Sequence, residues 1–356
     1  MKKRSAYWDN YKGILIFLVV FGHFIYSYAM KYNGSTADIL FTFIYIFHMP
    51  AFVFCSGFFS KSARSRGREA LLKLFLYYAV FNTLMMSYCY IFRGTETEII
   101  TPYNSYWYIL AVIVWRMAAE DLSSVKGIIP LMLLVTLFMG YWEEFTNLLS
   151  VRRIFAFGVF FVAGYIMRRE TVERITDNRK TVHWCIGVVF CGVSAAAVLW
   201  VVMNSNITLS MLLMSRYSQP GDILYRIFII AAAFAAIVSM LWLMPDKEIP
   251  FLTKTGRNSL LIYLVHRFIT LIYYGEFFKA ADYSGKYLIY AFVASVITCL
   301  VFGGDRINGV VNGWFDRLAA AILDKTDGKG TAIRTVMVVI FVAILISKPL
   351  LQLTEI

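Results

Sequence analysis

The sequence predicts an all-α membrane protein, a polytopic transmembrane helix bundle of about 10 or 11 membrane helices. Hydrophobic residues make up 60% of the 356 residues, and the mean hydropathy is +0.66. Charged residues make up 16%, against about 25% in a typical soluble domain, which is too little polar surface to cover a soluble body of this size. The apolar residues also occur in blocks near the length that a helix needs to cross a hydrocarbon core, and a backbone in lipid must satisfy its own hydrogen bonds.

Each apolar block marks one expected membrane helix. The blocks lie at about 13–30, 38–59, 71–92, 105–119, 125–141, 153–167, 181–203, 222–244, 257–275, 285–303 and 333–351. The segment 306–324 is instead predicted to be an interfacial helix, because its apolar residues recur at helical spacing with charges between them. We expect residues 1–356 to form a single membrane domain with no separate soluble domain.

The basic residues explain the formal net charge of +12 and predict the orientation of the chain. They lie mostly in short loops, which favours a role in topology and in contact with anionic lipid over nucleic-acid binding. With the N-terminus in the cytoplasm, about 24 of the 34 basic residues fall on the cytoplasmic side. We therefore expect a multi-pass plasma-membrane protein with a cytoplasmic N-terminus. The five cysteines show no spacing typical of a disulfide framework or a metal site, so no metal is expected.

Three of the four histidines, His23, His48 and His266, lie deep inside apolar blocks. Ionisable groups inside membrane helices are costly and by default mark function. Counted along the helices, each lies about 15 Å from the cytoplasmic end, near the middle of a core about 30 Å thick. Three imidazoles at one level suggest a common cavity, although each may instead serve only to bind a neighbouring helix. His183 lies at a helix mouth and is predicted to be interfacial.

Arginines gather at both faces of the predicted bundle. The loop KSARSRGRE carries Arg64 and Arg66 as an RxR pair, and guanidinium groups suit phosphate, although charge that only orients the protein is the alternative. On the opposite face, Arg152 and Arg153 begin one helix and Trp107 begins another. Aromatic rings beside charged groups suit sugars, but such residues are also typical membrane anchors.

The order of several motifs resembles the acyltransferase-3 family of membrane enzymes over nearly the whole chain. YWDNYKGILIFLVVFGHF (residues 7–24) matches the family's opening through Asp9, Lys12, Gly13 and His23. FHMPAFVFCSGFF (residues 47–59) matches its second helix, and the RxR pair follows. SYWYILAVIVWR and RRIFAFGVFFVAGY resemble two central helices, and GRNSLLIYLVH resembles a late helix containing Asn258 and His266.

Within the family the chain looks most similar to the fucose 4-O-acetylase-like branch. It departs from that pattern where Trp-Tyr-Ile replaces Trp-Phe-Leu and where Gly158 stands at a position often occupied by proline. These departures leave the acceptor open.

The resemblance implies a membrane O-acyltransferase that moves an acyl group, most simply acetyl, from cytoplasmic acetyl-CoA to a hydroxyl of a cell-surface or lipid-linked sugar in a bacterial plasma membrane. It implies His23 as general base, a role that suits neutral imidazole, with His48 orienting or stabilising. We assign donor binding to Arg64, Arg66 and Lys12. We assign acceptor binding to Asp9, Trp107, Arg152, Arg153, Asn258 and His266.

Several alternatives to direct transfer stay open at this point. An acyl-histidine relay fits the same residues, and the acceptor can enter from either face. A transporter or flippase for a lipid-linked glycan would use a similar polar cavity, and a non-catalytic subunit of a polysaccharide export complex is the remaining candidate. The sequence does not predict the oligomeric state.

Overall fold

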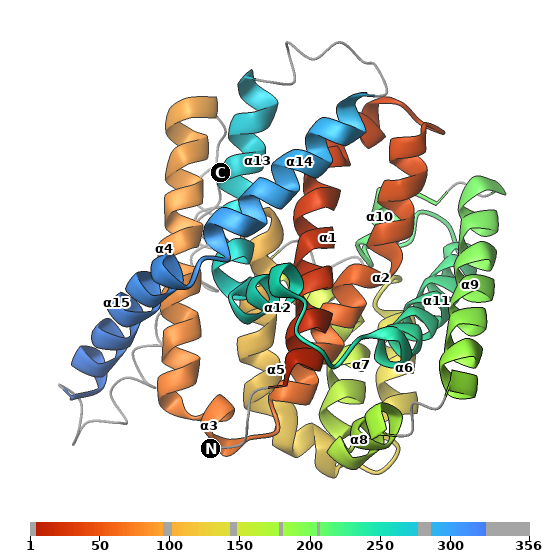
Figure 1. The fold of residues 1–356 in the computed structure, drawn as a ribbon, viewed down its shortest axis with the longest axis horizontal. Helices are drawn as coiled ribbons and strands as arrows, with labels where there is room; N and C mark the ends of the chain where they lie inside the picture. Colours follow the sequence, from red (N-terminus) through yellow and green to blue (C-terminus); the bar gives the residue numbers. More distant parts are fainter. Residues whose placement is uncertain are drawn as a thin grey trace, which may run out of the picture.

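The structure is a computed structural model, and it describes residues 5–94, 102–142, 148–177, 181–204, 207–276 and 286–324. Every regular element in these ranges is helical (Figure 1). The longest helices are α1 (Ala6–Lys31), α2 (Thr36–Phe59), α4 (Arg68–Arg93), α9 (Thr181–Asn204) and α11 (Asp222–Leu243). The remaining helices are α3 (Ala63–Arg66), α5 (Trp107–Ser124), α6 (Ile128–Phe138), α7 (Val151–Ile166), α8 (Arg169–Asp177), α10 (Leu209–Leu212), α12 (Pro250–Arg257), α13 (Ser259–Glu276), α14 (Lys286–Phe302) and α15 (Asp305–Asp324), with 3₁₀ turns η1 (Asn104–Tyr106) and η2 (Leu148–Ser150).

These helices confirm the predicted all-α bundle. The five longest are each long and apolar enough to cross a membrane, and α14 with α15, bent by 57° at their junction, would form a sixth span. Each predicted block up to residue 303 contains a helix, and the ends agree to within five residues except at the start of α1, which begins at Ala6 rather than at residue 13. The interfacial segment is also helical, as α15, and the predicted helix at 333–351 lies outside the described residues.

The short helix α12 falls outside the predicted blocks. Just before the block at 257–275, α12 starts at Pro250 and ends at Arg257, and Asn258 separates it from α13. Proline fits the first turn of a helix because no partner is needed for an N–H there. The Asn258 side chain donates to the Gly303 carbonyl and the Asp305 carboxylate, both at 2.8 Å, so the break is tied to the bend between α14 and α15.

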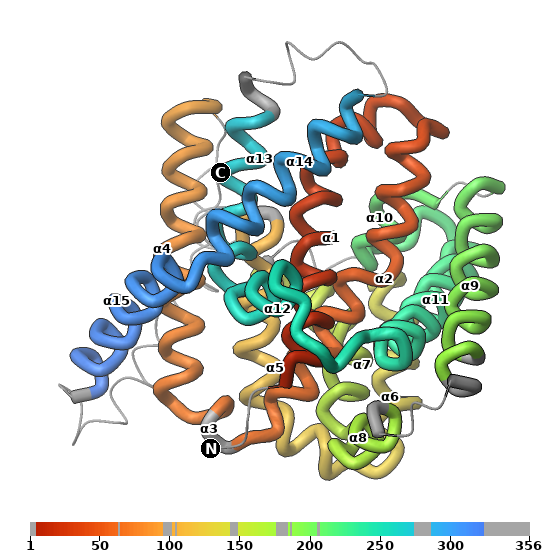
Figure 2. Tube along the Cα trace, in the orientation of Figure 1, coloured from red at the N-terminus to blue at the C-terminus, as the bar shows by residue number. Residues whose placement is uncertain are grey.

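Helices α1 and α2 lie side by side at the centre of the bundle (Figure 1). Around them, α12, α13 and α14 pack on α1, while α7, α9 and α11 pack on α2. The tube in Figure 2 shows α12 crossing α1, with α9 at the right-hand edge of the molecule. The largest fully buried side chains, which include Tyr11, Phe24 and Phe41, come in part from this central pair.

Two helix crossings bring backbones into direct contact at glycines. A Cβ on Gly256 of α12 would overlap the Asp9 carbonyl of α1, and one on Gly13 would overlap the Leu252 carbonyl. Between α2 and α7, a Cβ on Gly57 would overlap Phe161, and Gly164 meets α2 in the same way. Small residues at such crossings are typical of membrane bundles, where close packing replaces the hydrophobic driving force.

Polar side chains reinforce the crossing of α1 and α12. The buried Asp9 carboxylate pairs with Lys12 at 3.0 Å and lies 3.9 Å from Arg257 Nε. Asn10 donates to the carbonyls of Pro245 and Lys247 and accepts from the Thr253 hydroxyl at 2.6 Å. The first turns of α1 are therefore fixed to the segment that leads into α12.

The glycine crossings predict a selective effect of one methyl group. Gly256→Ala should destabilise the protein by about 1–3 kcal/mol, because the α12 backbone must move away from α1. Gly192→Ala in α9 is the matched control, since a Cβ there meets nothing within 4 Å. The measurement is the apparent Tm in detergent at one fixed scan rate. Equal Tm values for the two variants would contradict the proposed backbone contact.

Candidate active site

One cavity of about 280 Å³ beside the central helices has no charged side chain in its described lining. Two others have charged linings. The larger of these two, of about 220 Å³, is lined by residues of α1, α2, α4, α5 and α13: Lys12, Phe52, Cys55, Ser56, Phe59, Leu74, Tyr108, Ile109, Val112, Arg116, Ser259, Leu260 and Tyr263. The smaller, of about 60 Å³, is lined by Val19, His23, Tyr45, His48, Met49, Ser105, Trp107, Arg153, Phe157, Leu212, Leu213 and Tyr263. Lys12 and His23 are eleven residues apart on α1, so the cavities lie at levels about 16 Å apart along that helix.

Tyr263 lines both cavities and therefore forms part of the wall between them. Its ring packs edge-on against Tyr108, with centroids 5.2 Å apart, and its hydroxyl donates to the Ser105 carbonyl. Tyr108 in turn hydrogen-bonds Ser56 of α2. The wall is made of aromatic side chains held by hydrogen bonds to two other segments of the chain, at Ser56 and Ser105.

The structure brings His23, His48 and His266 close together, as their predicted depth suggested. His23 and His48 both line the smaller cavity. The His266 ring centroid lies 5.0 Å from that of His23, but His266 is fully buried and lies outside the lining of both cavities. His23 and His48 can therefore contact a molecule bound in the smaller cavity. His266 contacts His23 but does not reach the cavity.

His23 is hydrogen-bonded by two donors that belong to other helices. Arg267 Nη1 lies 3.0 Å from His23 Nδ1, and the Tyr45 hydroxyl lies 3.3 Å from the same nitrogen. Arg267 is 4% exposed and follows His266 on α13. Arg267 was not among the predicted site residues, although a charge within an apolar helix is itself a functional signal.

Hydrogen bonds to backbone carbonyls orient the other two histidines. His48 Nδ1 lies 2.8 Å from the Ile44 carbonyl, and His266 Nδ1 lies 2.6 Å from the Tyr263 carbonyl. Because a carbonyl oxygen only accepts, both Nδ1 atoms carry the proton and both Nε2 atoms keep a lone pair. A ring whose Nδ1–H is fixed in this way presents Nε2 as a base.

Arg153 and Trp107 contribute a charge and an aromatic surface to the smaller cavity. The Arg153 guanidinium lies 5.6 Å from the Trp107 ring centroid, as expected for a cation–π contact. No carboxylate lines this cavity among the described residues, so its charged lining is a guanidinium with histidines. Arg152 does not line this cavity, and its guanidinium donates to the Trp142 carbonyl at 3.0 Å.

The larger cavity has two cationic side chains, Lys12 and Arg116. Arg116 donates through Nε to the Ser60 hydroxyl at 3.1 Å and lies within 3.4 Å of the Ser65 carbonyl. Lys12 was predicted from the sequence, but Arg116 was not, because an arginine near the end of an apolar helix resembles an ordinary topology signal. Neither cavity has an acidic side chain among its described lining residues.

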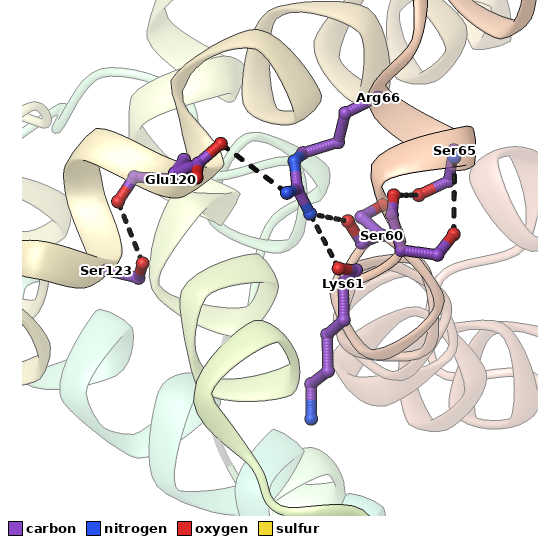
Figure 3. Close-up of polar contacts among 7 residues, drawn as sticks. Ser60, Lys61, Ser65, Arg66, Glu120 and Ser123 are labelled. Atoms are coloured by element: carbon purple, nitrogen blue, oxygen red, sulfur yellow. Dashed lines mark hydrogen bonds and ion pairs between the residues drawn. The ribbon is translucent and has the colours of Figure 1, made fainter.

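Arg66 caps the end of α2, as Figure 3 shows. It donates to the carbonyls of Ser60 at 2.9 Å and Lys61 at 2.7 Å, and its third partner is Glu120 of α5 at 3.4 Å. The Arg64 side chain lies outside the described residues. Burial and, to a smaller extent, Arg169 lower the pKa of the neighbouring Lys61 ammonium.

Four predicted acceptor-binding residues lie outside both cavities, namely Asp9, Arg152, Asn258 and His266. The Asp9 carboxylate forms ion pairs with Lys12 and Arg257. The Asn258 side chain hydrogen-bonds Asp305 at the bend between α14 and α15. In the described ranges, no group of three histidine, cysteine, aspartate or glutamate side chains has the arrangement of a metal site.

The family model of an acyltransferase domain, Acyl_transf_3, matches residues 5–303, which include every residue of both cavities. The chain belongs to the acyltransferase-3 family. It is also similar to the nodulation protein NolL of Sinorhizobium fredii (strain NBRC 101917 / NGR234), with 24% identity over 331 residues that cover 84% of this chain and 86% of that protein. No solved structure matches the chain.

These findings make the protein an acyltransferase with several membrane helices. The matched region places the histidines, the aromatic wall and both cationic linings inside the catalytic domain of this family. The assignment to the fucose 4-O-acetylase-like branch stays a prediction.

The contacts of Arg66 predict a structural effect of its removal. Arg66→Ala should lower the apparent Tm, because two carbonyls at the end of α2 lose a charged donor, and such bonds are worth about 1.5–3 kcal/mol each. Arg68→Ala is the control, since Arg68 is an exposed arginine two residues further along, at the start of α4. An unchanged Tm in Arg66→Ala, together with weaker binding of acetyl-CoA, would instead assign Arg66 to the donor alone.

Proposed function

We propose that this acyltransferase moves an acetyl group from cytoplasmic acetyl-CoA to a hydroxyl group of a cell-surface or lipid-linked sugar. The observation that carries the proposal is the pair of cavities that share Tyr263, one with a basic lining and one with histidines. A two-substrate transfer needs two binding sites that meet at the reacting atoms, and this arrangement supplies them.

The donor occupies the larger cavity in this proposal. Lys12 and Arg116 lie at the end of the bundle that holds the start of α1, and the distribution of basic residues predicts that this end faces the cytoplasm. Cationic side chains suit the phosphates of coenzyme A, with the RxR loop next to the same end of α2. The narrow thioester arm would then extend toward the wall formed by Tyr108 and Tyr263.

The acceptor occupies the smaller cavity. A sugar hydroxyl is a weak nucleophile until its proton is removed, and a histidine of this cavity serves as the general base. Trp107 supplies an aromatic plane for the sugar ring, and Arg153 supplies a donor for its oxygens. The hydroxyl oxygen attacks the thioester carbonyl, the carbon–sulfur bond breaks, and coenzyme A leaves as the thiol.

Release of coenzyme A tests the proposal directly. Purified protein in nanodiscs should release free coenzyme A from acetyl-CoA when sugar acceptors are offered, and His23→Ala should lower the rate about 10²–10⁴-fold. The mutant should still bind acetyl-CoA, because the donor cavity does not include His23. Movement of a lipid-linked glycan without any release of coenzyme A would favour a transporter.

A second experiment tests the donor cavity. Arg116→Gln should raise the KM for acetyl-CoA about 10–100-fold, since a charged hydrogen bond is worth about 1.5–3 kcal/mol, while kcat changes little. The glutamine can still bond Ser60, and Arg68→Ala controls for the general loss of positive charge on this face. A change in kcat with no change in KM would contradict a role in donor binding.

A further inference from the structure

The contact between Arg267 and His23 fixes the position of a proton. A guanidinium group has only donors and stays charged, so the His23 Nδ1 atom that it contacts at 3.0 Å must accept. The Tyr45 hydroxyl lies 3.3 Å from the same nitrogen. A hydroxyl can donate or accept, and here it donates because Nδ1 carries no proton. With its lone pair on Nδ1, a neutral His23 carries its proton on Nε2.

His48 has the opposite tautomer in the same cavity. Its Nδ1–H donates to the Ile44 carbonyl, which leaves the lone pair on Nε2. His48 Nε2 makes no hydrogen bond with the described residues, and His48 lines the cavity. One histidine thus presents a donor and the other presents a base.

We propose that His48 takes the proton of the acceptor hydroxyl, that His23 donates from Nε2–H to the developing oxyanion, and that Arg267 is the positioning residue that fixes the His23 tautomer. This inference rests on the proposed acyl transfer and divides its chemistry between the two histidines. It reverses the roles that the family resemblance implies for His23 and His48.

The division gives a balanced reaction. As the hydroxyl oxygen bonds to the thioester carbon, its proton moves to His48 Nε2, and the carbonyl oxygen gains a negative charge that His23 Nε2–H stabilises. When the tetrahedral intermediate collapses, the carbon–sulfur bond breaks and the proton on His48 passes to the leaving sulfur. The products are the ester and the coenzyme A thiol, and both histidines return to their starting tautomers.

The reverse assignment conflicts with the geometry around His23. Its Nε2 already carries a proton, so it could accept another only at Nδ1, which Arg267 and Tyr45 contact. Arg267 has little room to withdraw, because it is buried and its Nη1 also lies 3.5 Å from the Thr270 hydroxyl. A second positive charge on His23 would lie beside the guanidinium.

Glutamine substitutions separate a donor from a base. In His23→Gln the amide oxygen can accept from Arg267 while the amide N–H donates, so kcat should exceed that of His23→Ala by at least about 10-fold. In His48→Gln the amide cannot take a proton, so kcat should equal that of His48→Ala. The opposite pattern, with an active His48→Gln and an inactive His23→Gln, would overturn the proposal.

A double-mutant cycle tests whether Arg267 acts through His23. Arg267→Met should lower kcat by about 10–100-fold in the wild-type background, leave the KM for acetyl-CoA unchanged, and have no further effect on His23→Ala. Arg267→Lys, which keeps a charged donor, should recover part of the loss. An equal loss of kcat in both backgrounds would show that Arg267 acts independently of His23.

Nitrogen-15 NMR of histidine-labelled protein tests the tautomers without any turnover. The chain has four histidines, so the resonances can be assigned with the His23→Gln and His48→Gln variants. The expected spectrum at neutral pH has the proton of His23 on Nε2 and that of His48 on Nδ1, and Arg267→Met should shift only His23 toward a mixture. A His23 proton on Nδ1 would overturn the inference, whereas failure of the proposed acyl transfer would appear only as absent release of coenzyme A.

Discussion

The site depends on backbone contact between helices at four glycines. Gly13 and Gly256 let α1 touch α12, and Gly57 and Gly164 let α2 touch α7. Lipid supplies no hydrophobic force between helices, so close packing and hydrogen bonds must hold them together. Because α1 carries His23 and α2 carries His48, these crossings hold each histidine-bearing helix tightly against one neighbouring helix.

Buried polar groups show why position in a motif does not by itself give a role. Asp9 lies in the family's opening motif, where it was expected to bind the acceptor, yet its carboxylate pairs with Lys12 and Arg257. A buried charge is costly unless paired, and this pairing fixes the start of α1 against α12. The same clamp holds Lys12, whose side chain lines the larger cavity. Asp9 therefore holds the Lys12 ammonium beside the larger cavity.

The sequence predicted the helices well and the site in part. Blocks such as 38–59 match α2 closely, because the length of an apolar run limits the length of a membrane helix. The depth of His23, His48 and His266 also predicted that they would meet. Arg267 was missed because its partner His23 lies 244 residues away, and no periodicity in one chain reveals such a contact. The break at Asn258 was missed for a similar reason, since Asp305 holds it.

Helix α13 connects the wall and the proton chemistry. Tyr263, His266 and Arg267 lie within about one turn of each other, so the residue that separates the cavities and the residue that orients His23 share one rigid segment. Two hydrogen bonds hold α13 against the turn η1. The Tyr106 hydroxyl donates to the Leu264 carbonyl, and the Tyr263 hydroxyl donates to the Ser105 carbonyl. In the proposed reaction the thioester must reach His23 past Tyr263, and any shift of α13 that opens the wall would also move Arg267. In that reaction, opening of the wall would therefore also release the His23 tautomer, so the oxyanion donor would stay in place only while the wall excludes water from the thioester.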